Sequence, residues 1–154
     1  MTLVDNVHYF SCDITSPAAV KDAASAVRGF LGSPTILVNN AGIAYAHTIL
    51  DTSPGDLRKL FDVNLLSQFY TIQAFLPEMI KRKKGHIVTI ASMSSFVSFA
   101  ELTDYSATKA GVLALHEGLN QELKHRYDAP EIKTTVVHPT YVNTKLVNPY
   151  RASL

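Results

Sequence analysis

Hydrophobic positions along the chain alternate between two patterns. Short apolar runs rich in β-branched residues are typical of strands buried in a sheet. Longer stretches with apolar residues every three or four positions are typical of helices. The predicted strands are 8–13, 35–38, 86–91 and 132–137. The predicted helices are about 18–30, a stretch opening at 53–54, then 65–81 and 104–126.

Local signals mark the ends and faces of these helices. Ser16 and Pro17 are typical of a helix cap and first helical position, and the basic run before Gly85 is typical of a helix end. The predicted core faces carry Leu65, Phe69, Ile72, Leu76 and Met79 in one helix, and Val112, Leu115, Leu119 and Leu123 in the other. The helix predicted at 104–126 also carries a stripe of small residues, which permits close approach of a neighbouring element. The stripe consists of Ala107, Gly111, Ala114 and Gly118.

Strands that alternate with helices of this length predict an α/β fold, with parallel strands and helices on both faces of the sheet. Ligands of such sheets bind beyond the carboxyl ends of the strands. The polar residues of this chain fall there: Asp13, 39–42, Ser92 and 139–144. The pattern therefore predicts a ligand site at that edge of the sheet.

Composition narrows the classes of protein. The 154 residues and 47% hydrophobic content predict a single soluble domain, residues 1–154. A formal net charge of +1 gives no electrostatic reason to expect a nucleic acid or an anionic membrane as partner. Cys12 is the only cysteine, and the chain shows no signal peptide or membrane-spanning stretch, so we expect a cytoplasmic protein. We expect no metal site, because His47, His86, His116, His125 and His138 lack ligand spacing.

Tyr105 and Lys109 carry the candidate chemistry. They lie four residues apart in a predicted helix and therefore share a face. A nearby ammonium favours the phenolate and lowers the pKa of a tyrosine, which lets the phenol exchange protons near neutral pH. Ser92 follows a buried strand at the same predicted edge, so we expect its hydroxyl to meet that of Tyr105 on one substrate oxygen. The alternative is that Ser92, Ser94 and Ser95 only cap backbone groups in a loop.

Several motifs together resemble the short-chain dehydrogenases/reductases. They are Asn39-Asn40-Ala41-Gly42, Ser92, Tyr105-Ser106-Ala107-Thr108-Lys109 and Pro139, in matching order and similar spacing. The resemblance covers about residues 8–144 and implies NAD or NADP as cofactor. It also implies hydride transfer between the nicotinamide and an alcohol or carbonyl substrate, with the hydride chemistry supplied by the cofactor.

The resemblance assigns catalytic roles to residues of this chain. Tyr105 is implied as the acid/base, Lys109 as the group that lowers its pKa and binds the nicotinamide ribose, and Ser92 as the partner of the substrate oxygen. Asn64 matches the asparagine that holds a water in the proton relay. The alternative for Asn64 is a helix N-cap or a local backbone hydrogen bond.

The resemblance also assigns cofactor contacts. Asp13 matches the residue that contacts the adenine amino group, with a simple turn residue as the alternative. The implied contacts around the nicotinamide end come from Asn39, Ala41, Gly42, Tyr105, Lys109, Pro139, Val142 and Thr144. At Pro139-Thr140 the chain departs from the Pro-Gly that the family often has, which puts the geometry of that loop in doubt.

The glycine-rich phosphate loop of the family has no counterpart here, because the chain contains no Gly-x-x-x-Gly-x-Gly pattern. We therefore expect a partial Rossmann-like, doubly wound parallel sheet that lacks the first two strands and begins just before the third. In the family's strand order, 3-2-1-4-5-6-7, the third strand would then leave a gap with exposed edges or shift inward to pair with the fourth.

Two further expectations come from the resemblance. Segment 142–146 is similar to branches that act on retinoids, steroids and other lipid alcohols, some of which carry a membrane anchor that is not present in this chain. The two long helices are expected to form a homo-oligomer interface. Two alternative functions remain open: a catalytically inactive fragment that acts only as a dimerisation or interaction module, and a sugar-nucleotide epimerase or dehydratase. Cofactor binding would discriminate the enzyme from the module.

Overall fold

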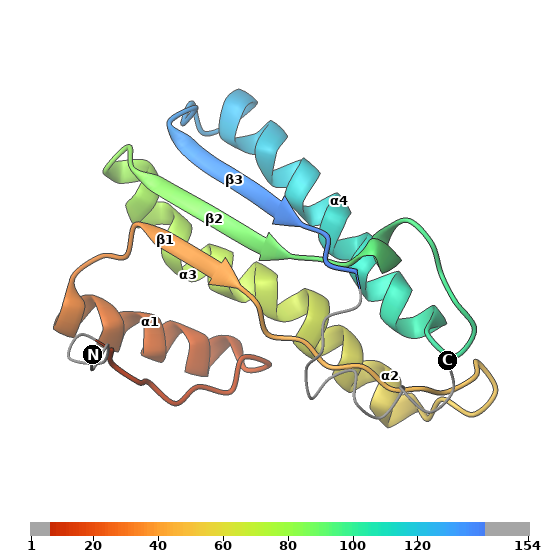
Figure 1. Ribbon diagram of the computed structural model, residues 1–154. Helices are drawn as coiled ribbons and strands as arrows, with labels where there is room; N and C mark the ends of the chain where they lie inside the picture. Colours follow the sequence, from red (N-terminus) through yellow and green to blue (C-terminus); the bar gives the residue numbers. More distant parts are fainter. Residues whose placement is uncertain (1–6, 141–154) are drawn as a thin grey trace, which may run out of the picture.

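The computed structural model describes residues 7–140 and contains one parallel sheet in that range (Figure 1). Its strands are β1 (Ile36–Asn39), β2 (Gly85–Ile90) and β3 (Ile132–Val137), in the spatial order β1-β2-β3. In register, Val38 lies beside Val88, and Val88 beside Thr135. The α/β class and the parallel arrangement predicted from the sequence are confirmed.

The helices α1 (Pro17–Leu31) and α2 (Pro54–Phe61) begin at the predicted signals. The other described helical elements are a π-helical turn (Asp62–Leu66), α3 (Ser67–Lys81), a 3₁₀ turn (Met93–Ser95) and α4 (Thr103–His125). The Ser16 hydroxyl accepts a hydrogen bond from the Ala19 N–H at 3.3 Å, and the Ser53 hydroxyl accepts one from the Asp56 N–H at 3.0 Å. Each serine thereby satisfies a backbone donor that the first helical turn leaves unpaired.

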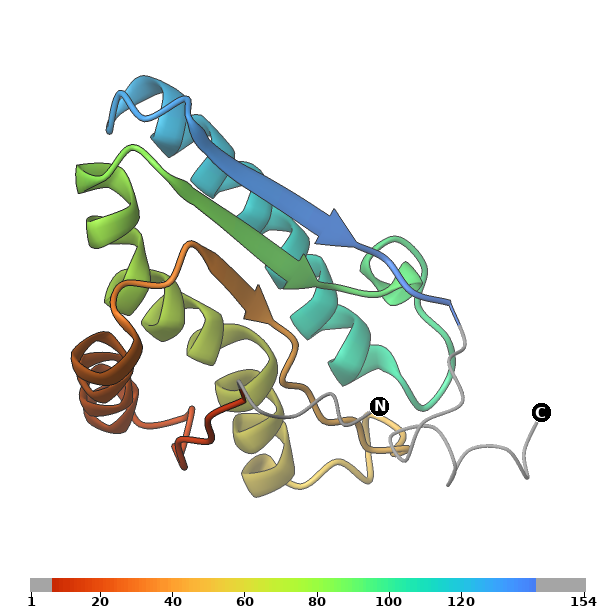
Figure 2. The same ribbon diagram turned by 60° about the vertical axis from the view of Figure 1, so that its left-hand side comes forward.

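The hydrophobic core lies between the sheet and the helices α3 and α4, which cover the same face of it (Figure 2). Its buried members are Ile72, Leu76, Met79, Ile87, Leu119, Leu123, Ala129 and Ile132. Most of the two predicted core faces is therefore confirmed. Phe69 is the exception, because it is 40% exposed.

The opposite face of the sheet is open among the described residues. Ile36 and Val38 are 60% and 54% exposed, whereas Leu37 packs against the core and Asn39 accepts a hydrogen bond from Thr71 of α3. Successive side chains of a strand alternate between the two faces of the sheet. In the apolar run at 35–38, alternate side chains are therefore covered by helices and the others are exposed. Helices on both faces were predicted; within residues 7–140 they cover one.

Residues 8–13, predicted as a strand, form none. A strand needs a neighbour to satisfy its backbone groups, and within the described range this segment pairs with neither edge of the sheet. The segment lies along α1 instead: the rings of His8 and Phe10 lie 4.7 and 6.4 Å from the ring of Phe30. The inward shift to pair with the next strand is therefore not found, and among the described residues the outer edge of β1 has no strand partner.

Gly85 has a different role from the predicted helix end. The positive φ after α3 belongs to Lys83, at 49°, and Gly85 is the first residue of β2. A Cβ on Gly85 would lie 2.7 Å from Met79 side-chain atoms. The glycine thus lets the core side chain of Met79 pack directly against the start of β2.

Candidate active site

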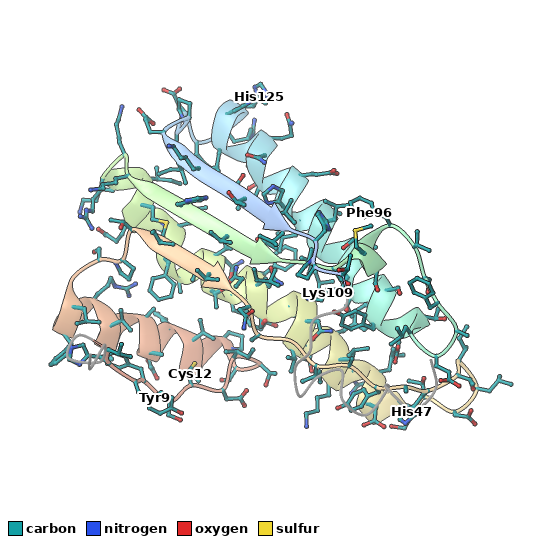
Figure 3. The ribbon with its side chains drawn as sticks, viewed as in Figure 1. Tyr9, Cys12, His47, Phe96, Lys109 and His125 are labelled. Atoms are coloured by element: carbon teal, nitrogen blue, oxygen red, sulfur yellow. The ribbon has the colours of Figure 1, made fainter. Side chains whose placement is uncertain are left out.

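The candidate site lies beyond the carboxyl ends of the three strands, as predicted. Gly42 follows β1, Ser92 follows β2 and Pro139 follows β3. The Met93 N–H donates to the Pro139 carbonyl at 3.0 Å, so the segments after β2 and β3 stay joined past the sheet. Figure 3 shows the side chain of Lys109, from α4, at this end of the strands.

Ser92 and Tyr105 meet at this edge. Ser92 begins the 3₁₀ turn that follows β2, and its hydroxyl accepts a hydrogen bond from the Ser94 N–H at 3.1 Å. The Ser92 side chain also lies close enough to the Tyr105 phenol to act on it as a polar partner, which lowers the pKa of the phenol. Ser92 therefore both caps its turn and contacts the candidate acid/base, which combines the two interpretations of this serine.

Lys109 lies one helical turn after Tyr105 on α4. Its side chain is only 3% exposed, and Nζ lies 5.7 Å from the centre of the Tyr105 ring. Nζ donates a hydrogen bond to the Ile90 carbonyl oxygen at 2.9 Å. Burial disfavours the ammonium and lowers the pKa of Lys109 to about 8.

The pKa of Tyr105 moves in the direction opposite to the prediction. The sequence predicted that the Lys109 ammonium lowers it, but burial raises it and outweighs the effect of Ser92. The physical reason is that removing a phenolate from water costs more than one hydroxyl partner restores. The Lys109 ammonium is directed at the Ile90 carbonyl oxygen in this structure.

Asn64 is fully buried in the π-helical turn between α2 and α3. Its side-chain oxygen accepts from the Ile43 N–H at 2.8 Å, and its Nδ2 donates to the Ile43 carbonyl at 2.9 Å and to Thr108 Oγ1 at 3.1 Å. The amide thus binds backbone, as in the alternative given above, but it bridges to the loop after β1 rather than capping its own helix. A π-helical turn inside a longer helix often accompanies a functional site.

Thr108 is a site residue that the sequence analysis did not single out. It is fully buried, accepts the hydrogen bond from Asn64 and donates to the Tyr105 carbonyl at 2.7 Å. The signal was present: Thr108 lies inside the Tyr105–Lys109 motif, beside the lysine. It links the π-helical turn to the first turn of α4.

The segment after β1 closes the other side of the site. Asn39 is buried, and its side-chain oxygen accepts from Thr71 Oγ1 at 2.7 Å, which ties β1 to α3. Ala41 is exposed. A Cβ on Gly42 would lie 3.6 Å from Asn64 Oδ1 and 3.8 Å from Lys109 Nζ. The absence of a side chain at Gly42 therefore keeps the space over the lysine open.

Asp13 lies in the loop before α1. Its Oδ1 accepts from the Thr15 N–H at 2.9 Å and from the Thr15 hydroxyl at 2.7 Å, which is the turn-residue role given as its alternative. The residue also borders a groove of about 490 Å³ between this loop and α2, lined on the far side by Arg58, Lys59 and Val63. Val142 and Thr144 lie outside the described residues.

Among residues 7–140, no three His, Cys, Asp or Glu side chains gather as a metal site would require. None of the helices described there is both long enough and apolar enough to cross a membrane.

Comparison with known proteins agrees with this geometry. The family model of the short chain dehydrogenases matches residues 2–154. Dehydrogenase RED2 of Cochliobolus heterostrophus is 48% identical over 132 residues, which are 86% of this chain and 50% of RED2. Estradiol 17-beta-dehydrogenase 11 of Homo sapiens is 36% identical over 148 residues, 96% of this chain and 49% of the relative.

A solved structure shares the fold as well. A gluconate 5-dehydrogenase from Burkholderia cenocepacia, in complex with NADP and tartrate, superposes with a TM-score of 0.83 at 32% identity, over 89% of this chain and 52% of that one. The chain therefore belongs to the short-chain dehydrogenase family. It spans about half the length of these relatives.

Proposed function

We propose that the chain carries the catalytic half of an oxidoreductase that transfers a hydride between NAD or NADP and an alcohol or carbonyl substrate. The observation that supports this most directly is the buried Lys109, whose Nζ lies 5.7 Å from the centre of the Tyr105 ring, with Ser92 acting on the same phenol. Membership of the family, whose model matches residues 2–154, supports the same activity and a single domain.

In the proposed mechanism the protein moves the proton. A bound nicotinamide supplies or accepts the hydride. The Ser92 hydroxyl holds the substrate oxygen, and the Tyr105 hydroxyl donates a proton to that oxygen in reduction or removes one in oxidation. Lys109 Nζ lies 5.7 Å from the centre of the Tyr105 ring, and the charged form of Lys109 would stabilise the phenolate that proton donation leaves.

The described residues fit such a cofactor at two places. Gly42 leaves open the space over Lys109, where the ribose and nicotinamide would bind beside Ala41 and Pro139. The groove bordered by Asp13 is large enough for an adenine, and its lining carries the cations Arg58 and Lys59 and the carboxylates Asp13 and Asp62. A relative solved with NADP supports use of this class of cofactor. Asn39 and Asn64 support the loop between the two places, and Val142 and Thr144 are proposed to reach the carboxamide.

The proposed substrate has an apolar body. The segment that follows Ser92 exposes Met93, Phe96, Val97 and Phe99, which are 43%, 59%, 55% and 60% exposed. Apolar side chains this close to the reacting hydroxyls would favour a lipid-like alcohol or ketone. A relative named for estradiol is consistent with that class.

We further propose that two copies associate through α3 and α4. Phe69 of α3 is 40% exposed, and Gly118 of α4 has open space where a side chain would be. Ala107 and Ala114 are also exposed, so most of the small-residue stripe is free for close approach of another helix. Gly111 is not part of that surface, because it already packs against Leu65 of the same chain.

Titration with NADH and NADPH, followed by the fluorescence of the reduced nicotinamide, tests the function. We expect one of the two to bind, Lys109→Met to weaken binding at least about tenfold, and Lys81→Met, at an exposed position, to leave it unchanged. The same titration is made on a chimera that places a relative's glycine-rich loop and its preceding strand ahead of this chain. If the chimera folds but binds neither NADH nor NADPH, the proposed oxidoreductase function is rejected in favour of a non-catalytic interaction module.

A further inference from the structure

A histidine ring lies against the main chain of the candidate catalytic serine. His138 Nδ1 is 3.0 Å from the Ser92 carbonyl oxygen. A carbonyl oxygen can only accept, so Nδ1 must carry the hydrogen and donate it. This fixes the tautomer of a neutral His138: the hydrogen is on Nδ1, and Nε2 carries none.

The backbone ladder explains why a side chain is needed at this point. The Ala91 N–H donates to the Val137 carbonyl at 2.9 Å, which continues the register of β2 and β3 past the end of the sheet. In a parallel ladder the N–H of residue 139 would then donate back to the Ala91 carbonyl. Pro139 has no N–H, so the ladder loses a hydrogen bond immediately before Ser92.

The imidazole supplies a hydrogen bond one residue further along. The Ser92 carbonyl accepts from both His138 Nδ1 and the Ser95 N–H, at 3.0 Å each. The ring of Phe96 lies 4.6 Å from the His138 ring at an angle of 46°, which holds the imidazole in place from the other side. Ser92 is thus bound from the strand side by His138 and from its own turn by Ser95.

We propose that His138 is a positioning residue: its Nδ1–H fixes the Ser92 main chain so that the Ser92 hydroxyl faces Tyr105. The proposal rests on the proposed function for its catalytic meaning. Rotation of the Ser92 peptide would carry the hydroxyl with it, and its action on the Tyr105 phenol would be lost. Phe96 contributes by limiting the rotation of the imidazole.

The tautomer can be tested without any substitution. In ¹⁵N spectra of the imidazole rings of the unmodified chain, recorded where the rings are neutral, His138 should show its hydrogen on Nδ1. His86, whose Nε2 lies 2.8 Å from Thr135 Oγ1, serves as a ring outside the site for comparison. A His138 ring with its hydrogen on Nε2 would overturn the proposal, whether or not the chain binds a nicotinamide cofactor.

A double-mutant cycle tests the effect on Tyr105. The readout is the ¹³Cζ chemical shift of Tyr105 at neutral pH, assigned with Tyr105→Phe and referenced to Tyr127, which donates to Glu122 away from the site. We expect Ser92→Ala and His138→Leu to move the Tyr105 signal in the same direction. His138→Asn, whose amide can also donate, should restore most of it, and His138→Leu should add nothing to Ser92→Ala.

Other outcomes count against the positioning role. If His138→Leu leaves the Tyr105 signal unchanged, or moves it equally with and without the Ser92 hydroxyl, His138 only fills space. If His138→Leu fails to fold, His138→Asn and the tautomer measurement still decide. The proposed function can fail separately. If no nicotinamide cofactor binds but the double-mutant cycle gives the expected result, the enzymatic function is rejected and the role of His138 in positioning Ser92 remains.

Discussion

Lys109 Nζ donates a hydrogen bond to the carbonyl oxygen of Ile90 at 2.9 Å. This contact joins the second turn of α4 to the last residue of β2, two residues before Ser92. Tyr105 lies one helical turn earlier on α4. The relationship therefore fixes the helix that carries the candidate acid/base relative to the strand end that carries its serine partner.

Burial of Lys109 makes stability depend on pH in a defined window. The pKa of Lys109 falls from its ordinary 10.5 to about 8 in the folded chain. Between these values the unfolded chain holds a proton that the folded chain has released, so the free energy of unfolding should rise with pH. Urea unfolding measured from pH 7.5 to 9.5, in steps of about half a unit, checks this.

Lys109→Met is the matched control for that experiment. It removes the titrating group, so the rise with pH should largely disappear. The window ends below pH 10, because the raised pKa of Tyr105 acts in the opposite sense once the unfolded phenol begins to ionise. An equal rise in the unmodified chain and in Lys109→Met would assign the pH dependence to other groups.

Asn64→Ala should destabilise the fold by about 3 kcal/mol. The substitution leaves the Ile43 N–H and carbonyl without their partner and removes the hydrogen bond to Thr108 Oγ1, all from a fully buried position. Urea unfolding measures the loss. Asn40→Ala is the comparison, since Asn40 is exposed in the neighbouring motif, and it should change stability by less than about 0.5 kcal/mol. Similar losses from both would contradict the bridging role of Asn64.

Substitution of alanine for glycine should change the free energy of unfolding in opposite directions at Gly85 and Gly29. Gly85→Ala places a Cβ 2.7 Å from Met79 side-chain atoms, so it should cost about 1–3 kcal/mol. Gly29 lies in α1 with nothing within 4 Å of its added Cβ, so Gly29→Ala should stabilise the chain by up to about 1 kcal/mol. Thermal unfolding of the two variants separates these outcomes, and stabilisation by Gly85→Ala would show that Met79 has room to move.

Gly118→Leu tests the proposed association of two copies. It fills the open space at the small-residue stripe of α4, where, among residues 7–140, no atom outside the adjoining helix backbone lies within 4 Å of the added Cβ. The variant should stay folded but associate at least about tenfold more weakly in sedimentation equilibrium. Unchanged association would exclude this part of α4 from the interface.

Much of the fold followed from local patterns. Ile132–Val137 is found with the bounds predicted, and Ser16 and Pro17 open α1 as expected, because β-branched runs and caps act over a few residues. The segment before α1 did not form the predicted strand. Whether a strand forms depends on a neighbouring edge, which local composition does not reveal.

Part of the candidate site could also be predicted from local patterns. The meeting of Ser92 and Tyr105 followed from their places at the carboxyl edge of a parallel sheet. The direction in which the pKa of Tyr105 moves could not be predicted, because it depends on how deeply the phenol is buried. Thr108 was passed over although it lies inside the Tyr105–Lys109 motif, because its partner Asn64 is 44 residues away in sequence. His138 was missed because it binds a backbone carbonyl oxygen, a partner that has no signature in sequence spacing.

Turnover with and without the Tyr105 hydroxyl tests the central claim most directly. Apolar alcohols and ketones are offered with each nicotinamide cofactor to this chain and to the chimera, and hydride transfer is followed by the absorbance of the reduced nicotinamide. We predict that Tyr105→Phe lowers kcat by about 10²–10⁴-fold, while Tyr127→Phe, at a half-exposed tyrosine away from the site, leaves it unchanged. Two results would contradict the account. One is turnover in Tyr105→Phe at the unmodified rate, and the other is the absence of turnover with every pair of substrate and cofactor.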